Sequence, residues 1–522
     1  MPIADRPSTA RQWARQRLIE LWVCYADGLA ATDANGVAAG LAAARADGAR
    51  IAVVAGPGVP AAVGNTLDET ADLVLGGPRP PSPRAIREAA AILGMEDARR
   101  TGVLGATLDA LEAGHRAGAA AIVGLAAAGS TDRRALLAGQ PDLIIEPGGL
   151  AAADAQRWGS RRPLRQLVLL NPGPTVVSDR VHRAIGGPDL CHREPEYTAL
   201  AEGIERRLLQ VAGAPTGWRA VLLAGSGTSA MEAMVAASTR PGRRLLVVRN
   251  GTYGERLATM AERHGTERVS VEAEHWQPVA PSAVADALDA DPDIDAVAVV
   301  QHETTTGLLN PLAEIAAVAR ARGRLLAVDA ISALGAEELP LADGGIDFVA
   351  GTANKCLQGL PGMAFVLLSP AAQARAREAR PTSLYLDLAN YLAAADRGAP
   401  PFTPSIPAAY GLEAALDELL DEGVAARRER YRARMARLDE ALERLGLSPA
   451  VAAPHRSATV RAYRLPAGIA YPDLHDRLKA AGYVIYAGQG SAAADQFRVC
   501  LLGEVGIGAV DGFVAELRAI LG

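Results

Sequence analysis

Short apolar segments alternate with alanine-rich helical segments along almost the whole of this 522-residue chain. In the first part of the chain, the helical segments 35–48 and 82–94 both end in glycine, as helices commonly do. The apolar segments there are 18–26, 50–56, 71–77, 101–106, 119–126 and 142–147. Strands that alternate with helices favour a parallel sheet with helices on both of its faces. The pattern therefore predicts an α/β fold.

The composition changes at residues 151–166, which are rich in arginine and poor in large apolar residues. We therefore expect a first domain over 1–155 and a linker over 156–166. Further along the chain, strands are predicted at 219–225, 244–251, 295–302, 324–331 and 348–355. Two helical runs then precede a smaller α+β segment with strands at 458–465, 483–488 and 496–503. These patterns predict a large domain over 167–420 and a small C-terminal domain over 421–522.

Charge and apolar patterning exclude several classes of protein. The formal net charge of −6 has the wrong sign for a nucleic-acid-binding surface, so we expect no nucleic-acid partner. No apolar run approaches the roughly 18 residues of a membrane span, and the N-terminal sequence lacks the apolar core of a secretory signal. The cysteines form no CxxC pair, which argues against a thiolate metal site and fits a reducing compartment; they are Cys24, Cys191, Cys356 and Cys500. We expect a cytoplasmic protein with no bound metal.

Lysine is the rarest basic residue of the chain. Of the 53 Lys and Arg residues, only Lys355 and Lys479 are lysines. Lys355 follows a predicted buried strand and is flanked by small residues, surroundings that favour the neutral, nucleophilic form of an amine. The alternative is an ordinary lysine at a strand end with its charged group in solvent. Lys479 lies on a predicted exposed helix over 473–482.

Two further features strengthen the functional interpretation of Lys355. Asp329 ends an apolar strand, where a side chain enters the ligand-binding crevice of an α/β protein, although it could simply cap the next helix. The glycine-rich turn at Ser226, Gly227 and Thr228 opens a helix whose free N–H groups can bind phosphate, although such turns are common. Together, a phosphate turn, an aspartate and a lysine are what pyridoxal phosphate (PLP) requires. The sequence therefore predicts a PLP site.

Several motifs in family order support this cofactor. The segment ANKCLQGLPG (353–362) resembles the active-site lysine segment of the 2-aminoethylphosphonate–pyruvate transaminases, which belong to the class V, fold-type I aminotransferases. Other matching segments are LLNPGPTVVS (169–178), AGSGTSAMEA (224–233), NGTYGERL (250–257), HETTTGLLNP (302–311), VDAISALGA (328–336), PFTPS (401–405) and FRVCLLG (497–503). The resemblance covers about 167–522 and implies a large mixed or parallel sheet domain followed by a small α+β domain.

The resemblance also implies a role for each matching residue. Lys355 would bind the cofactor covalently and move the proton, and Asp329 would hold the proton on the pyridine nitrogen. Ser226, Gly227 and Thr228 would bind the cofactor phosphate. Thr306 would lie near the 3′-hydroxyl, Tyr253 would pack near the ring, and Arg498 would receive the phosphonate or carboxylate of the substrate. Thr403 matches a position that reaches the cofactor of a neighbouring subunit, which implies a homodimer with shared active sites.

One segment departs from the phosphonate transaminases. PDLCHREPEY (188–197) resembles an element of serine–pyruvate and alanine–glyoxylate aminotransferases instead. Either His192 and Arg193 face the substrate, or they only order a loop. The function that we expect is PLP-dependent transfer of the amino group of 2-aminoethylphosphonate to pyruvate. The alternative is a class V serine or alanine aminotransferase that uses glyoxylate or pyruvate.

The first domain is similar to the haloacid-dehalogenase hydrolase core, and RPPSPRAIREAAAILG (79–94) resembles part of phosphonoacetaldehyde hydrolase. This likeness leaves open a bifunctional enzyme with an active hydrolase domain. The catalytic positions argue against it, because the resemblance aligns Tyr25 with the nucleophilic aspartate, Ala55 with a hydroxyl residue and Ala106 with the metal-binding aspartate. The chain also has no room for a cap domain after Asp27 and no lysine in 1–354. We therefore predict a capless, degenerate, Rossmann-like domain of the haloacid-dehalogenase type.

Overall fold

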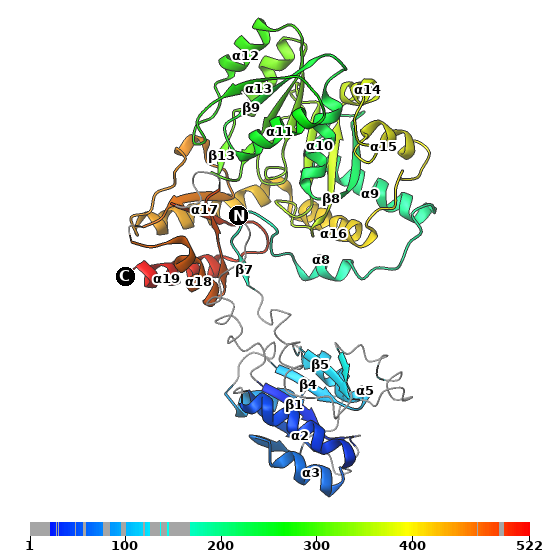
Figure 1. Cartoon of the computed structure of the whole chain (residues 1–522), viewed down its shortest axis with the longest axis vertical. Helices are drawn as coiled ribbons and strands as arrows, with labels where there is room; N and C mark the ends of the chain where they lie inside the picture. Colours follow the sequence, from blue (N-terminus) through cyan, green and yellow to red (C-terminus); the bar gives the residue numbers. More distant parts are fainter. Residues whose placement is uncertain are drawn as a thin grey trace. The chain divides into compact units, whose positions relative to one another are not determined.

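The computed structural model describes residues 21–27, 29, 31–46, 49–55, 59–76, 84–94, 101–117, 119, 121–125, 136, 143–145, 167–466, 468–489 and 495–521. The chain divides into two compact units, Met1–Leu167 and Val168–Gly522. Figure 1 draws the described elements of the first unit in blue and cyan. The predicted linker, 156–166, lies outside the described residues.

The first unit is built on a six-stranded parallel sheet with the strand order β3-β2-β1-β4-β5-β6. Its strands are β1 (Leu21–Tyr25), β2 (Arg50–Val54), β3 (Leu73–Leu75), β4 (Thr101–Gly105), β5 (Ala121–Leu125) and β6 (Leu143–Ile145). One face packs against α2 (Ala31–Ala46) and α3 (Ala61–Asp68), and the other against α4 (Arg84–Ile92) and α5 (Leu108–Ala117). The predicted parallel sheet with helices on both faces is therefore confirmed.

A seven-stranded mixed sheet with the order β10-β9-β11-β14-β15-β16-β8 forms the centre of the second unit. Its strands are β8 (Arg219–Gly225), β9 (Arg244–Arg249), β10 (Arg268–Glu272), β11 (Ile294–Val300), β14 (Leu325–Asp329), β15 (Phe348–Thr352) and β16 (Gly362–Leu368). β16 runs antiparallel to its neighbours β15 and β8. The predicted segments include five of these strands and miss β10 and β16. β10 is short and mixes polar with apolar residues, so its apolar pattern is weak.

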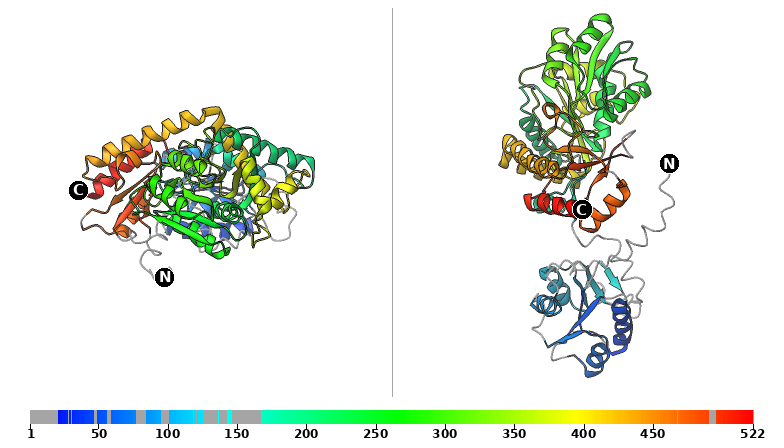
Figure 2. Two further views of the ribbon diagram at one scale, coloured as in Figure 1. Left: turned by 90° about the horizontal axis from the view of Figure 1, so that it is seen from above. Right: turned by 90° about the vertical axis from the view of Figure 1, so that its left-hand side faces the viewer.

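Helices cover both faces of this sheet (Figures 1 and 2). One core contains side chains of α9 (Pro195–Ala212), α12 (Pro281–Ala290), α13 (Leu312–Ala321) and α16 (Ile406–Glu422). The other contains side chains of α10 (Gly227–Ser238), α11 (Thr252–Arg263), α14 (Pro370–Glu378) and α15 (Leu388–Ala395). The ends of α9 follow the sequence closely: Pro195 occupies its first turn, and Gly213 ends it with a left-handed φ of 61°.

The C-terminal elements form a smaller layer of their own. They are α17 (Val424–Glu443), β17 (Val460–Arg464), α18 (Tyr471–Ala480), β18 (Tyr483–Val484), β19 (Tyr486–Ala487), β20 (Gln496–Cys500) and α19 (Ile507–Leu521). β17, β20 and β19 make an antiparallel sheet, whereas β18 pairs with β7 (Val168–Leu169). The predicted strand 483–488 is thus divided between two sheets at the buried Ile485. Among the described residues, no helix combines the length and the apolar character needed to cross a membrane.

Candidate active site

The order and direction of the strands bring Asp329, Lys355 and the glycine-rich turn to one edge of the mixed sheet. Asp329 is the last residue of β14, and Lys355 follows the neighbouring strand β15 by three residues. β8 runs antiparallel to β16, and therefore in the same direction as β14 and β15. Its carboxyl end, which leads into Ser226, lies at the same edge. This edge is where α/β proteins place their ligands.

Lys355 is half-buried and lies against the segment NPGP (171–174). Its ammonium donates a hydrogen bond to the carbonyl of Pro172. Gly173 has a φ of +124°, and a Cβ added there would lie 2.9 Å from Cδ of Lys355. A side chain at this position would therefore displace the lysine, which explains why a glycine stands beside it.

Asp329 is buried, with 3% of its surface exposed. Its Oδ1 accepts a hydrogen bond of 2.9 Å from the backbone N–H of Ile331, so the aspartate also caps the turn that follows β14. Burial raises the pKa of Asp329 to about 6, against the opposing charges of Lys355 and Arg256. Asp329 is therefore a desolvated carboxylate that depends on nearby positive charge.

The segment HETTTG (302–307) begins with β12 (His302–Glu303), leads into β13 (Leu308–Leu309) and contributes polar groups to the same region. Thr306 is buried, and its hydroxyl donates to the carbonyl of Glu303 and accepts from the N–H of Leu308, both at 3.3 Å. The predicted contact residue Thr306 thus uses its hydroxyl within its own turn. The buried hydroxyl of Thr304 and Nε2 of His302 have no hydrogen-bond partner in the described part of the chain.

Glu303 was not predicted as a site residue, yet it organises the start of α11. Its buried carboxylate accepts the N–H groups of Gly254 at 2.8 Å and Tyr253 at 3.2 Å. A Cβ on Gly251 would lie 2.3 Å from Cδ of Glu303, so glycine leaves room for this carboxylate. Burial raises the pKa of Glu303 to about 7, and the charge of Asp329 acts in the same direction. The available sequence signal was a helix start at Gly251 that has no capping side chain.

The turn Ser226–Thr228 opens α10 as predicted. Ser226 is exposed at the N-cap position, and its side chain makes no capping hydrogen bond. A Cβ on Gly227 would lie 2.7 Å from Cδ1 of Ile331, so a side chain there would meet the turn that follows Asp329. The start of α10, with its free N–H groups and the positive end of the helix dipole, therefore lies beside the turn that follows Asp329 and is suited to bind an anion.

Two arginines reach this region from different elements. Arg498 is a buried residue of β20, and its guanidinium donates to the carbonyls of Ala487 at 2.8 Å and Thr304 at 3.0 Å. Arg256 of α11 lies with its Cζ 4.7 Å from the ring centroid of Tyr253, and it donates to Oγ1 of Thr228 at 3.4 Å. Arg498 and Tyr253 were predicted from the sequence, whereas Arg256 was not.

The remaining predicted residues make no hydrogen bond or ion pair to Lys355 or Asp329 in the described part of the chain. His192 is half-buried and Arg193 is exposed, in the loop before α9. Thr403 is exposed beside Phe402, whose ring centroid lies 5.1 Å from that of Tyr385. Tyr385 in turn donates to the carbonyl of Ala224, near the end of β8.

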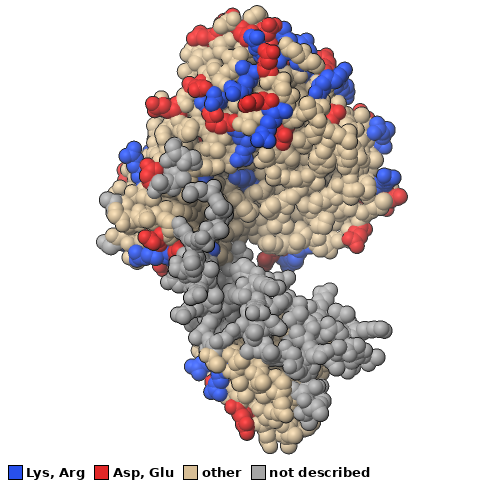
Figure 3. Space-filling view, viewed as in Figure 1, with Lys and Arg blue, Asp and Glu red and all other residues tan. Residues whose placement is uncertain are grey.

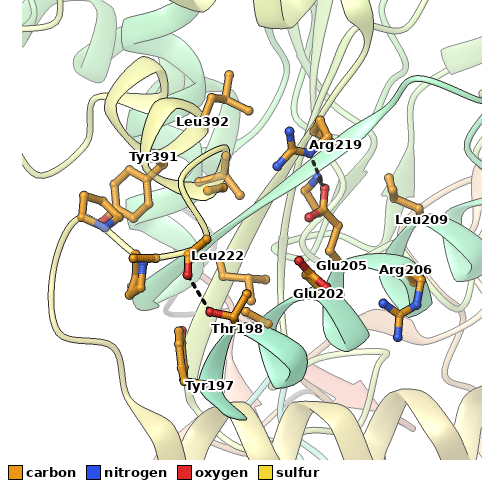
Figure 4. Close-up of a pocket in the computed structure, with 18 residues that line it drawn as sticks. Tyr197, Thr198, Glu202, Glu205, Arg206, Leu209, Arg219, Leu222, Tyr391 and Leu392 are labelled. Atoms are coloured by element: carbon orange, nitrogen blue, oxygen red, sulfur yellow. Dashed lines mark hydrogen bonds and ion pairs between the residues drawn. The ribbon is translucent and has the colours of Figure 1, made fainter. Parts of the chain in front are cut away.

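A groove of about 450 Å³ lies between α9, β8, α15 and residues 398–401 (Figure 4). At one point Thr198 donates to the carbonyl of Gly398 at 2.6 Å, and elsewhere Arg219 pairs with Glu205 at 2.8 Å. None of the predicted site residues lines this groove. No group of three or more His, Cys, Asp or Glu side chains in the described ranges could hold a metal ion.

Residues 178–500 match the family model described as aminotransferase class-V, and the chain belongs to this family. It is 37% identical over 363 residues to the 2-aminoethylphosphonate–pyruvate transaminase of Burkholderia mallei, which covers 69% of this chain and 98% of that protein. The transaminase of the same name from Burkholderia pseudomallei is 36% identical over 363 residues, which again cover 69% of this chain and 98% of that protein.

Solved structures agree with this assignment. An alanine–glyoxylate aminotransferase from Nostoc sp. superposes with a TM-score of 0.65 at 27% identity, over 69% of this chain and 96% of its own. A pyridoxamine–pyruvate aminotransferase from Mesorhizobium loti gives a TM-score of 0.64 at 27% identity, over 68% of this chain and 93% of that protein. The second unit therefore has the fold-type I architecture, and the protein is a PLP-dependent aminotransferase.

The residues at the sheet edge fit PLP. A helix start without a capping side chain suits the phosphate, and Gly227 lets this helix start pack closely against Ile331, two residues after Asp329. A buried carboxylate suits a protonated ring nitrogen, and a lysine amine stands one strand away. The unpartnered polar atoms of His302 and Thr304 add buried groups that still have a hydrogen bond to make.

Proposed function

We propose that this aminotransferase transfers the amino group of 2-aminoethylphosphonate to pyruvate, giving phosphonoacetaldehyde and alanine. The observation that carries the proposal is the similarity to the Burkholderia transaminases of that name, which extends over 98% of their length. The buried Arg498 supports it, because its guanidinium bonds only to carbonyls and pairs with no carboxylate in the described part of the chain. Such a group suits the anionic end of a phosphonate or keto acid.

The proposed roles follow from the surroundings of each residue. PLP supplies an electron sink for the carbon that bears the amino group. Lys355 would hold the cofactor through Nζ, and the same atom would take the proton from the carbon that bears the substrate's amino group. Asp329 holds a proton on the ring nitrogen. Arg498 orients the substrate through its anionic group, and the Ser226–Thr228 turn holds the cofactor phosphate.

A donor screen tests the proposal. The purified full-length protein, loaded with PLP, is mixed with single amino donors, and the change in cofactor absorbance is recorded. We expect a half-reaction with 2-aminoethylphosphonate and its reversal by pyruvate. Reaction with L-serine or L-alanine but not with 2-aminoethylphosphonate would establish the alternative suggested by residues 188–197. Arg498→Lys keeps the charge but loses the planar fork, and we expect it to raise KM for 2-aminoethylphosphonate more than it lowers kcat.

We also propose a cytoplasmic homodimer in which Thr403 contributes to the partner's active site. Charged side chains gather in the upper part of Figure 3, whereas the area where Figure 1 places α10, β8 and α15 is almost free of them. The side chain of Leu384 is 74% exposed, and that of the next residue, Tyr385, is 37% exposed. The ring of Tyr385 packs against that of Phe402, which precedes Thr403. A second copy of the chain would cover these apolar side chains.

For the first unit we propose a degenerate domain of the haloacid-dehalogenase type over 1–155, followed by a linker over 156–166. Tyr25, Ala55 and Ala106 stand at the ends of the neighbouring strands β1, β2 and β4, and Tyr25 is fully buried. The two alanines offer neither a nucleophile nor a metal ligand, and burial raises the pKa of the Tyr25 phenol to about 12, so it is not ionised at neutral pH. The full-length protein should release no phosphate from phosphonoacetaldehyde with Mg²⁺. Release that is unaffected by Lys355→Ala would refute the proposal.

A further inference from the structure

Arg256 is a half-buried cation that lies within electrostatic range of Asp329 but forms no direct ion pair among the described residues. It lies one turn after Tyr253 on α11, so both side chains project from the same side of the helix. Several other half-buried arginines of this unit do pair with carboxylates, such as Arg207 with Asp417 and Arg249 with Glu255, each at 2.6 Å. Arg256 forms no such ion pair within the part of the chain that the structure describes. Its charge is therefore available for an anion.

The guanidinium of Arg256 lies beside the phosphate turn. Its donor group is 3.4 Å from Oγ1 of Thr228, a long hydrogen bond that a better acceptor would replace at little cost. Thr228 is the second residue of α10, so the free N–H groups of that helix lie at the same place. The positive charge of Arg256 also lowers the pKa of the buried Asp329, against the effect of burial. The guanidinium of Arg256 is thus close enough to the site to stabilise the charged form of its buried aspartate.

We propose that Arg256 binds the phosphate group of PLP, together with the Ser226–Thr228 turn. The proposal rests on the assignment of that turn to the cofactor phosphate. A guanidinium presents several N–H donors in one plane and stays charged at any working pH, which suits a phosphate. The ring of Tyr253, 4.7 Å from Cζ, holds the guanidinium in place by a cation–π contact.

The test compares two forms of the cofactor that differ in the phosphate. Full-length cofactor-free protein is titrated with PLP and with pyridoxal, which lacks the phosphate, and binding is followed by protein fluorescence. In Arg256→Met we expect PLP to bind roughly 10- to 100-fold more weakly and pyridoxal to change by less than about twofold. The inhibition constant of inorganic phosphate against PLP binding should also be higher in Arg256→Met than in the wild type. Arg256→Lys, which keeps the charge, should lose less affinity than Arg256→Met.

Arg263→Met is the matched control, because Arg263 is an exposed arginine in the last turn of the same helix. It should bind both forms as the wild type does. The proposal is overturned if Arg256→Met binds PLP as tightly as the wild type, or if PLP and pyridoxal weaken equally, since the residue would then act through Tyr253 alone. If Arg256→Met does not fold, the same comparison made with Arg256→Lys decides. A wild-type protein that binds no PLP would refute the cofactor assignment itself.

Discussion

Asp329 and Glu303 are buried carboxyl groups at the same end of the mixed sheet, and both have a pKa raised by burial. The two groups act on each other, because the charge of Asp329 adds to the rise in the pKa of Glu303. Each is held by backbone N–H groups, Asp329 by Ile331 and Glu303 by Gly254 and Tyr253. The site therefore combines two carboxyl groups whose pKa values are raised with the basic side chains of Lys355 and Arg256.

This arrangement predicts how the stability of the cofactor-free protein depends on pH. The pKa of Glu303 rises from 4.5 in the unfolded chain to about 7 in the folded one, so the folded state binds the proton more tightly. The resulting stabilisation is complete below about pH 4.5 and is lost as pH rises through 7. Over this range the free energy of unfolding falls by up to about 3 kcal/mol. In Glu303→Gln this part of the pH dependence should disappear.

Urea unfolding of the cofactor-free proteins at pH 5 and pH 8 measures the effect. The free energy of unfolding of Glu303→Gln should fall below that of the wild type by more at pH 5 than at pH 8, because the amide of glutamine does not titrate. The exposed Gln210 of α9 supplies the control substitution Gln210→Ala, which changes no titratable group, so its difference from the wild type should not change with pH. Equal differences for Glu303→Gln at both pH values would contradict the prediction.

The two lysines of the chain should differ in their effect on catalysis. Lys355→Ala should lose the visible absorbance of bound PLP and reduce transamination by at least about 10²- to 10⁴-fold, because it removes the covalent anchor and the proton carrier. Lys479→Ala, on α18 in the C-terminal layer, should keep both. Absorbance spectra and steady-state rates of the two variants decide between them. Retained absorbance in Lys355→Ala would contradict the assignment.

Among the elements, α11 links the cofactor site to the segment HETTTG. Its N-cap is Gly251, which has no side chain to satisfy the first N–H groups, and Glu303 supplies the acceptor from another element. The same first turns carry Tyr253 and Arg256. The position of this helix start therefore decides where the ring of Tyr253 and the guanidinium of Arg256 lie.

Gly251→Ala tests this link. The added Cβ would lie 2.3 Å from Cδ of Glu303, so the carboxylate must move away from the N–H groups of α11. We expect a loss of about 1–3 kcal/mol in stability together with weaker PLP binding. Gly508→Ala in α19 is the control, because nothing lies within 4 Å of the added Cβ. Urea unfolding and PLP titration measure both effects, and unchanged PLP binding in Gly251→Ala would contradict the link.

At the scale of the whole molecule, the proposed dimer makes a prediction about mass. Light scattering of the PLP-loaded protein should give twice the chain mass of 54.1 kDa. Leu384→Asp places a charge on an apolar side chain that is 74% exposed, and it should shift the protein toward the monomer and lower its activity. Ile507→Asp, at a 48% exposed position on α19, should remain dimeric. A wild-type monomer with full activity would refute the shared site.

The local pattern of the sequence was sufficient for much of the fold. Strands β8, β9, β11, β14 and β15 were predicted because each is a short, apolar run bounded by polar residues or turns. The division of 483–488 between β18 and β19 could not be predicted, because it depends on the distant strand β7. Long-range pairing leaves no local signal in either partner.

The sequence by itself determined the class of chemistry. A lysine after a buried strand, an aspartate at a strand end and a glycine-rich turn are local features, and each can be recognised without its neighbours. Only the tertiary structure decided which other groups share the site. Glu303 lies at the site because β12 brings its carboxylate to the start of α11, and Arg256 because α11 lies beside α10. Burial and unpaired charge are properties of an environment, and segments far apart in the sequence create that environment only when the chain folds.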